Sequence, residues 1–337
     1  MKPGCRAGGC EGSLAGMERD LTGRRMGPRP AAQLSRRALV AGLGALAAAP
    51  RTAAADQPAA RDSFLILGDW GRRGAPAQRA VAEQMAAWAR RFGSRFVVTV
   101  GDNFYKYGVS DTLDSHWRQS FADVYDLQTL HTWYPALGNH DYRGDPDAQV
   151  GFSGRFPGWR MDGRYYRQSV ALAGGRSLDL FVLDTAPLAD PQHFPQRRST
   201  VRAQWDWFDR EMLASTADWK LVVGHHPLVS SGYQERAYPL LDAWLTPRLE
   251  RFGVHAYLSG HDHHLEHLRV GGVTHVVSGG GAGGDPMTLR RPAGHVQGWP
   301  SAGFAAVEVA GDLMTMTFVD DRGRELGSAP IRRDRRL

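Results

Sequence analysis

The stretch FVVTVGDNFY, residues 96–105, joins an apolar run to a cluster of polar side chains. Its first half, Phe96 to Val100, has the length and composition of a buried strand. The glycine that follows allows a sharp turn, and Asp102 after it is suited to a turn or to a metal ion. The same arrangement recurs in FLILGDWG (64–71), LGNHD (137–141), VVGHHP (222–227) and LSGHDH (258–263). The pattern predicts a site at the carboxyl ends of strands, which is typical of α/β proteins.

The remaining sequence alternates between strand-like and helix-like segments. Between the first two strands, apolar residues from Val81 to Phe92 recur at the spacing of one helix face. Further strands are expected at 178–183, 219–223, 255–259, 273–278, 303–309 and 313–319, and helices at 202–217 and 238–252. The last three strands follow one another without helices, which indicates mixed sheets. No internal repeat or low-complexity linker follows residue 62, so we expect a single α/β domain.

Charge is distributed unevenly along the 337 residues, whose formal net charge is +6. Residues 1–55 hold nine of the 41 Lys and Arg but three of the 35 Asp and Glu, which leaves 32 of each sign in the rest of the chain. A body of nearly zero net charge lacks the general field that attracts polyanions, so nucleic-acid binding is not expected. No run approaches the roughly 18 apolar residues of a membrane span.

Residues 1–55 have the features of a lead-in followed by an export signal. Arg36 and Arg37 precede an apolar, alanine-rich stretch, and the alanines at 53–55 supply a small-residue cleavage site. The arginine pair resembles a twin-arginine signal, so we expect the precursor to meet that export machinery and the product to be periplasmic or secreted. Both cysteines precede the signal, and the exported body would therefore contain neither disulfides nor thiolate ligands.

The quoted segments together provide a set of metal-type donors. Two carboxylates, a phenol, an amide and three imidazoles come from Asp69, Asp102, Tyr105, Asn139, His225, His261 and His263. Hard oxygen donors combined with imidazole favour iron, manganese or zinc. His261 and His263 would project to one side of an extended backbone, which suits joint ligation. An aspartate after a strand is more often a turn residue, but the ordered set is hard to reach by chance.

These motifs resemble those of the purple acid phosphatases, within the calcineurin-like metallophosphoesterases. The family pattern Asp-x-Gly, Gly-Asp-x-x-Tyr, Gly-Asn-His-Asp, Val-x-x-His and Gly-His-x-His is matched at every position, and Tyr105 narrows the resemblance to this family. Similarity covers most of residues 63–320 and is closest to the small, tartrate-resistant branch. The resemblance implies a four-layer α-β-β-α sandwich of two mixed sheets at 62–325. The arginine cluster near the end of the chain indicates a basic, solvated tail at 326–337.

The resemblance also implies a binuclear metal centre. It would contain a ferric ion (Fe3+) and a second divalent ion (Fe2+, Zn2+ or Mn2+). The ferric ligands would be Asp69, Asp102, Tyr105 and His263, and the divalent ligands would be Asp102, Asn139, His225 and His261. The implied activity is acid hydrolysis of small-molecule phosphate monoesters by a metal-bound hydroxide.

Further residues are candidates for catalysis. His140 is expected to assist the leaving group, and Asp141 is expected to orient its imidazole. The tartrate-resistant enzymes resembled here carry a Glu-His pair near positions 233–234, where this chain has Tyr and Gln. Glu235 or His226 could take over that role.

Two alternative functions remain open on the sequence. A phosphodiesterase or nucleotidase could use the same metal pair, and a catalytically silent phosphate- or metal-binding protein could retain the same scaffold. The glycine run at 279–284 lacks the Gly-Lys-Ser/Thr ending of a nucleoside triphosphate loop, so that class of binding is not expected.

Overall fold

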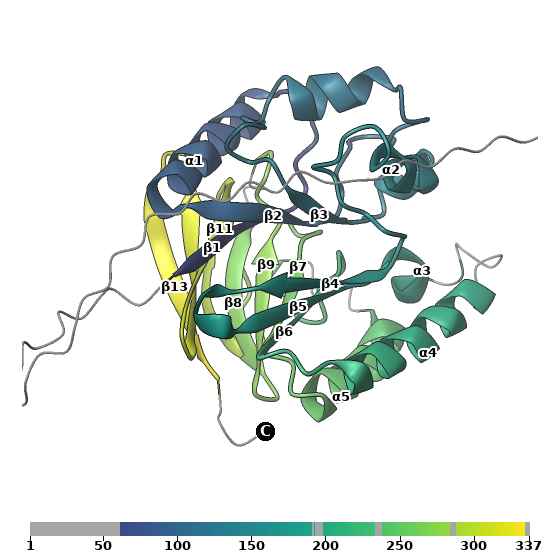
Figure 1. Cartoon of the computed structure of the whole chain (residues 1–337), viewed down its shortest axis with the longest axis vertical. Coiled ribbons are helices and arrows are strands. Elements are labelled where there is room, and N and C mark those ends of the chain that lie inside the picture. The colour runs from purple at the N-terminus through teal and green to yellow at the C-terminus, as the bar shows by residue number, and fades with distance from the viewer. Residues whose placement is uncertain (1–60, 191, 193–197, 233–237, 284–287, 334–337) are drawn as a thin grey trace, which may run out of the picture. The chain divides into compact units, whose positions relative to one another are not determined.

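The computed structural model describes residues 61–190, 192, 198–232, 238–283 and 288–333. All of them belong to the unit that spans Ala54–Leu337. Two mixed sheets lie face to face in this unit, with helices on their outer sides (Figure 1). The predicted four-layer α/β sandwich is therefore confirmed. The expected leader at 1–55 and the candidate residues at 233–235 lie outside the described residues.

The first sheet has six strands in the order β13-β12-β11-β1-β2-β3. Strands β1, β2 and β3 are parallel, and β11, β12 and β13 extend the sheet in antiparallel fashion. The bounds are Asp62–Leu67 for β1, Ser94–Val100 for β2, Trp133–Ala136 for β3, Gly303–Ala310 for β11, Leu313–Asp320 for β12 and Glu325–Arg332 for β13. The three parallel strands consequently end at one edge.

The second sheet has seven strands in the order β10-β8-β9-β7-β6-β5-β4. Strands β5, β6, β7 and β9 are parallel, whereas β4, β8 and β10 pair antiparallel. The bounds are Tyr166–Ala171 for β4, Ser177–Val182 for β5, Trp219–Val223 for β6, Ala256–Ser259 for β7, Leu265–Val270 for β8, Val273–Ser278 for β9 and His295–Trp299 for β10. Its parallel strands also end together.

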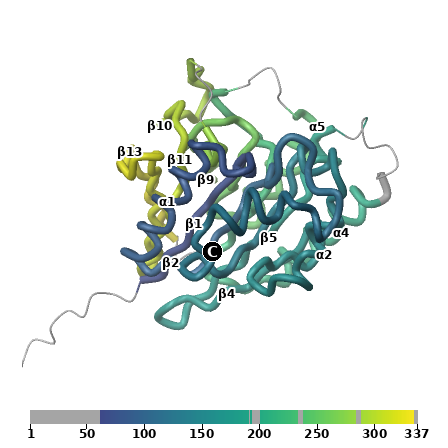
Figure 2. Tube along the Cα trace, turned by 90° about the horizontal axis from the view of Figure 1, so that it is seen from above, coloured from purple at the N-terminus to yellow at the C-terminus, as the bar shows by residue number. Residues whose placement is uncertain are grey.

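Helices cover the outer faces of the sheets (Figures 1 and 2). Helix α1, Pro76–Phe92, buries the predicted apolar face and contacts β1, β2 and β11. It ends at Gly93, whose φ of 66° gives the left-handed cap that glycine adopts without strain. Helices α4, Arg198–Ala214, and α5, Pro239–Arg251, form a second core with the other sheet. The shorter helices are α2, Pro146–Phe152, and α3, Ala186–Ala189. Among the described residues, no helix has the length and apolar character needed to cross a membrane.

The expectation of a solvated basic tail from residue 326 is wrong for the described part of that segment. Residues 325–332 form strand β13, which pairs with β12, and Ala329 and Ile331 are buried in the core. After the strand, Arg333 Nη2 lies 2.9 Å from Asp312 Oδ1. The buried positions of this strand are Ala329 and Ile331, so its sequence shows little of the alternation of apolar and polar residues that marks a strand.

Direct contacts join the carboxyl-terminal edges of the two sheets. Ser278 at the end of β9 donates its hydroxyl to the Ile66 carbonyl of β1 at 3.0 Å. Gly281 donates its backbone N–H to the Gly68 carbonyl, also at 3.0 Å. The polar loops that follow β1, β2, β3, β6 and β7 are therefore brought to one place.

Candidate metal centre

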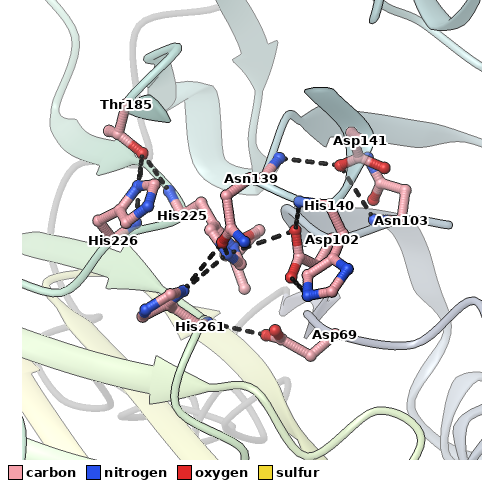
Figure 3. A network of polar contacts seen from close by, with 12 residues as sticks. Asp69, Asp102, Asn103, Asn139, His140, Asp141, Thr185, His225, His226 and His261 are labelled. Carbon is pink, nitrogen blue, oxygen red and sulfur yellow. Dashed lines mark hydrogen bonds and ion pairs between the residues drawn. The ribbon is translucent and has the colours of Figure 1, made fainter. Parts of the chain in front are cut away.

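All seven predicted ligands lie at this shared edge, each in the loop after a strand. Asp69 follows β1, Asp102 and Tyr105 follow β2, Asn139 follows β3, His225 follows β6, and His261 and His263 follow β7. Figure 3 shows most of these side chains pointing toward one another. They come from both sheets, so the site exists only when the two halves of the domain are packed together.

The backbone at three of these ligands has a left-handed conformation. Asp69, Asp102 and His261 have φ values of 61°, 49° and 71°. Such positions cost about 1–3 kcal/mol each for residues other than glycine and are concentrated at functional sites. A Cβ at Gly101 would lie 2.6 Å from His225 Nδ1, so only glycine allows this close packing. The expectation of an extended backbone from His261 to His263 is wrong, because His261 turns the chain.

One half of the cluster is arranged around the phenol oxygen of Tyr105. This atom lies 2.7 Å from Asp69 Oδ1, 2.9 Å from Asp102 Oδ2 and 3.0 Å from His263 Nε2. His263 Nε2 is in turn 3.5 Å from Asp69 Oδ1. The His263 side chain therefore joins the oxygen-rich half of the cluster.

The other half is arranged around the amide oxygen of Asn139. His225 Nε2 and His261 Nδ1 each lie 3.1 Å from Asn139 Oδ1 and are 3.2 Å apart. Asp102 Oδ1 is 3.5 Å from His225 Nε2. Asp102 thus presents one carboxylate oxygen to each half.

The chemistry of this donor set fits bound cations. The Tyr105 hydroxyl has one hydrogen, yet two buried carboxylate oxygens lie within 2.9 Å of it. One carboxylate oxygen therefore faces an oxygen lone pair. His225 Nδ1 lies 2.9 Å from the Val100 carbonyl, which can only accept, so the neutral ring directs the lone pair of Nε2 into the cluster. A cation between such atoms would turn repulsion into attraction.

Burial and neighbouring groups raise the pKa of one predicted ligand, Tyr105, and lower the pKa of two others, Asp69 and His261. Burial, together with the charges of Asp69 and Asp102, raises the pKa of Tyr105 well above its usual value. Burial also raises the pKa of Asp69, but the hydrogen bonds with His263 and Tyr105 and the neighbouring histidines together lower it overall. Burial and the neighbouring His225 lower the pKa of His261 to about 4, which leaves its imidazole neutral and able to ligate.

His140 lies beside the cluster, but Asp141 does not orient it as expected. His140 Nδ1 donates to the Lys106 carbonyl at 2.9 Å, and its ring packs on Tyr105 with centroids 4.4 Å apart. The Asp141 carboxylate instead accepts the backbone N–H groups of Gly138 at 2.8 Å and of Asn103 and Phe104 at 3.1 Å. The prediction for Asp141 is wrong because His140 only precedes the 3-10 turn, Asp141–Arg143, and the Asp141 side chain is directed to the backbone of the adjoining loops instead. Asp141 joins the loops after β2 and β3.

His226 is held in one tautomer by Thr185. The Thr185 hydroxyl accepts the backbone N–H groups of His225 and His226 at 3.0 and 3.2 Å, which uses both of its lone pairs. Its hydrogen is therefore donated to His226 Nδ1, 2.9 Å away, and the neutral ring carries its own hydrogen on Nε2. Burial lowers the pKa of His226 well below the usual value, and the neighbouring His261 and His225 lower it further. His226 lies close enough to His225 and His261 to share a metal ion, but its tautomer favours a hydrogen-bond donor over a ligand.

Two residues of this site were missed by sequence reasoning. Thr185 lies in a Leu-Asp-Thr stretch whose similarity to the family extends beyond the metal motifs, and that stretch could have indicated it. Tyr238 places its hydroxyl 2.8 Å from His261 Nε2, and no local pattern in the sequence marks it.

Comparison with known proteins agrees with this geometry. The calcineurin-like phosphoesterase family matches residues 57–265. Purple acid phosphatase 3 of Arabidopsis thaliana is 33% identical over 80% of this chain and 78% of its own length. Human tartrate-resistant acid phosphatase type 5 is 32% identical over 82% of this chain and 92% of its own length.

Solved structures share the fold at lower identity. GAP50, the anchor in the inner membrane complex of Plasmodium, superimposes with a TM-score of 0.71 at 22% identity, over 82% of this chain and 90% of its own. The yellow lupin purple acid phosphatase PPD1 superimposes with a TM-score of 0.62 at 18% identity, over 82% of this chain and 55% of its own. From its sequence relatives and its family match, the chain belongs to the calcineurin-like phosphoesterases and, among them, to the purple acid phosphatase family.

Proposed function

We propose that this protein hydrolyses phosphate monoesters at a binuclear metal centre, as an acid phosphatase of the purple type. The observation that supports this proposal most is the position of Asp102. Its two carboxylate oxygens face two separate sets of donors, one around Tyr105 and one around Asn139. A carboxylate placed in this way is suited to bridge two cations.

The donor chemistry supports an unequal pair of ions. Asp69, Asp102, Tyr105 and His263 would hold Fe3+, because anionic oxygens stabilise a hard trivalent ion. Asp102, Asn139, His225 and His261 would hold the divalent ion, which is Fe2+, Zn2+ or Mn2+. When bound, the pair supplies positive charge to the phosphate oxygens and lowers the pKa of a water molecule.

We assign two histidines a role on the ester itself. His140 uses Nδ1 for the Lys106 carbonyl, and its Nε2 lies 3.9 Å from Asp102 Oδ2. This nitrogen faces the cluster. At acid pH the protonated ring carries hydrogen on both nitrogens, and we assign to its Nε2–H the proton that the leaving oxygen receives, which leaves His140 neutral. His226 offers its Nε2–H as a fixed donor to a phosphate oxygen, because Thr185 holds Nδ1. Asp141 acts at a distance, by holding the loops that carry Asp102 and Asn139.

A comparison of two substrates tests the proposed activity. The metal-loaded full chain is assayed with a matched aryl phosphate monoester and diester between pH 4 and 8. Faster hydrolysis of the monoester, with an acid optimum, is expected. A preference for the diester would move the function to a phosphodiesterase or nucleotidase. Phosphate binding without turnover of either ester, with both ions present, would favour the catalytically silent alternative.

We also propose that the product is exported, to the periplasm or the medium. The support is the charge and composition of residues 1–55, with Arg36 and Arg37 ahead of an apolar stretch and alanines at 53–55. Sequencing the amino terminus of the mature protein tests this. A terminus near Asp56 is expected, and an intact leader on the active protein would contradict it.

A further inference from the structure

Tyr238 connects the start of helix α5 to the nitrogen-rich half of the candidate centre, which is formed by Asn139, His225 and His261. It is the residue before the first turn of α5. Its hydroxyl lies 2.8 Å from His261 Nε2, and its ring packs edge-on against His226 with centroids 4.7 Å apart. A side chain outside all five motifs therefore contacts two of the histidines at the site.

The two nitrogens of His261 have different surroundings. Nδ1 faces Asn139 Oδ1 and His225 Nε2, at 3.1 and 3.2 Å. Nε2 faces the Tyr238 hydroxyl. A ring that gives its Nδ1 lone pair to a cation must carry hydrogen on Nε2, and Tyr238 Oη is in place to accept that hydrogen.

The other imidazole in this half is held by the backbone. His225 Nδ1 donates to the Val100 carbonyl at 2.9 Å, so the backbone of strand β2 orients this ring. The main chain of His261 is also fixed, since its N–H donates to Asp69 Oδ2 at 2.9 Å. The orientation of the His261 ring about its side-chain bonds is therefore a feature that a neighbouring side chain such as Tyr238 can fix.

We propose that Tyr238 is a positioning residue that holds His261 in the Nε2–H tautomer and thereby strengthens binding of the divalent ion. The proposal rests on the binuclear centre proposed above. It concerns the divalent ion, because the Tyr238 hydroxyl lies 2.8 Å from His261, which belongs to the half of the cluster around Asn139. Hydrogen-bond partners of metal-bound histidines typically contribute about 10–100-fold to metal affinity.

Tyr238→Phe tests the proposal because it removes one oxygen and retains the ring that packs on His226. Tyr165→Phe is the matched control, since it removes a hydroxyl from a ring that packs on Trp207. The metal-loaded full chain and both variants are dialysed against increasing chelator. The iron and divalent-metal content of each is measured, together with the visible absorbance of the iron–phenolate pair.

The expected result is selective loss of the divalent ion. Tyr238→Phe should release it at about 10–100-fold lower chelator concentration, while iron content and visible absorbance stay at the wild-type level. The control should match the wild type in both. Equal divalent affinity in Tyr238→Phe and the wild type, or parallel loss of both ions from the variant, would overturn the role of Tyr238. A wild-type chain that retains no divalent ion would contradict the binuclear centre itself, and this outcome is recognisable without any variant.

Discussion

The Thr185 hydroxyl lies 2.9 Å from His226 Nδ1 and also accepts the backbone N–H groups of His225 and His226. Thr185 follows strand β5, and the two histidines follow its parallel neighbour β6. One side chain thus determines where His226 carries its hydrogen and how the loop of a metal ligand is held.

Thr185→Val should weaken both functions of this hydroxyl. The variant has nearly the same shape but leaves two buried N–H groups without an acceptor, at about 1–3 kcal/mol each. It also frees His226 to change tautomer, so we expect kcat/KM for a monoester to fall about 10-fold, the equivalent of one hydrogen bond. Thr185→Ser retains the hydroxyl and should stay close to the wild type. Equal kcat/KM values and thermal midpoints for the two variants would contradict this role.

Tyr105→Phe should remove the visible absorption of the iron-loaded protein. The variant retains the ring that packs on His140 but lacks the oxygen at the centre of the oxygen-rich half. A phenolate bound to ferric iron is the expected source of the colour. The measurement is the absorption spectrum after iron loading, with Tyr142→Phe as a control that also removes a hydroxyl from this region. A band that survives in Tyr105→Phe would exclude Tyr105 as the iron ligand.

Asp184→Asn should change how stability depends on pH. Burial raises the pKa of Asp184 to about 7, although the hydrogen bond that it accepts from Tyr142 favours the charged form. The unfolded value is about 4, so the folded chain binds this proton more tightly. Its contribution to stability is complete below about pH 4 and is lost as the pH rises through about 7.

Asparagine cannot release this proton, so the variant escapes the loss. The difference in unfolding free energy, Asp184→Asn minus wild type, should therefore increase from pH 4 to pH 7, by at most about 1.4 kcal/mol per pH unit. Chemical denaturation of the two proteins at each pH measures it. A difference that stays constant with pH would show that Asp184 is ionised in the folded chain.

Ile331→Ala tests whether strand β13 belongs to the folded domain. Ile331 is 6% exposed and lies opposite Met314 in the register of β12 and β13. Deleting its buried carbons should cost about 2–5 kcal/mol of unfolding free energy. Arg332→Ala, at the exposed next position, should cost much less. Equal midpoints of thermal unfolding for the two variants would restore the prediction of a solvated tail.

The metal ligands could be predicted from the sequence because each follows a strand within a few residues. The local sequence is sufficient to predict them, since Asp69 and Asp102 stand directly after the glycine that follows a strand. Strands with few apolar residues were not predicted, because their own sequence gives no strand pattern. β8, for example, contains His267 and Arg269, so it lacks the pattern of a buried strand.

Contacts that depend on tertiary packing could not be predicted in this way. Tyr238 precedes His261 by 23 residues, and only the packing of α5 against the sheet brings them together. Asp141 shows the opposite error, because adjacency to His140 in the chain suggested a contact that the fold does not make. Its carboxylate points to the backbone of Asn103 and Gly138.

Asp102→Ala tests the central claim most directly, because Asp102 presents one carboxylate oxygen to each half of the donor cluster. Metal content and hydrolysis of an aryl phosphate monoester are measured on the same preparations of the variant and the wild-type chain. The wild type should contain two ions and hydrolyse the monoester at acid pH. The variant should lose at least one ion, and its activity should fall by more than about 100-fold. This fall is larger than the loss expected on removing a residue that only orients a ligand. An Asp102→Ala protein that retains wild-type turnover, or a wild-type protein that holds two ions without hydrolysing the ester, would contradict the account.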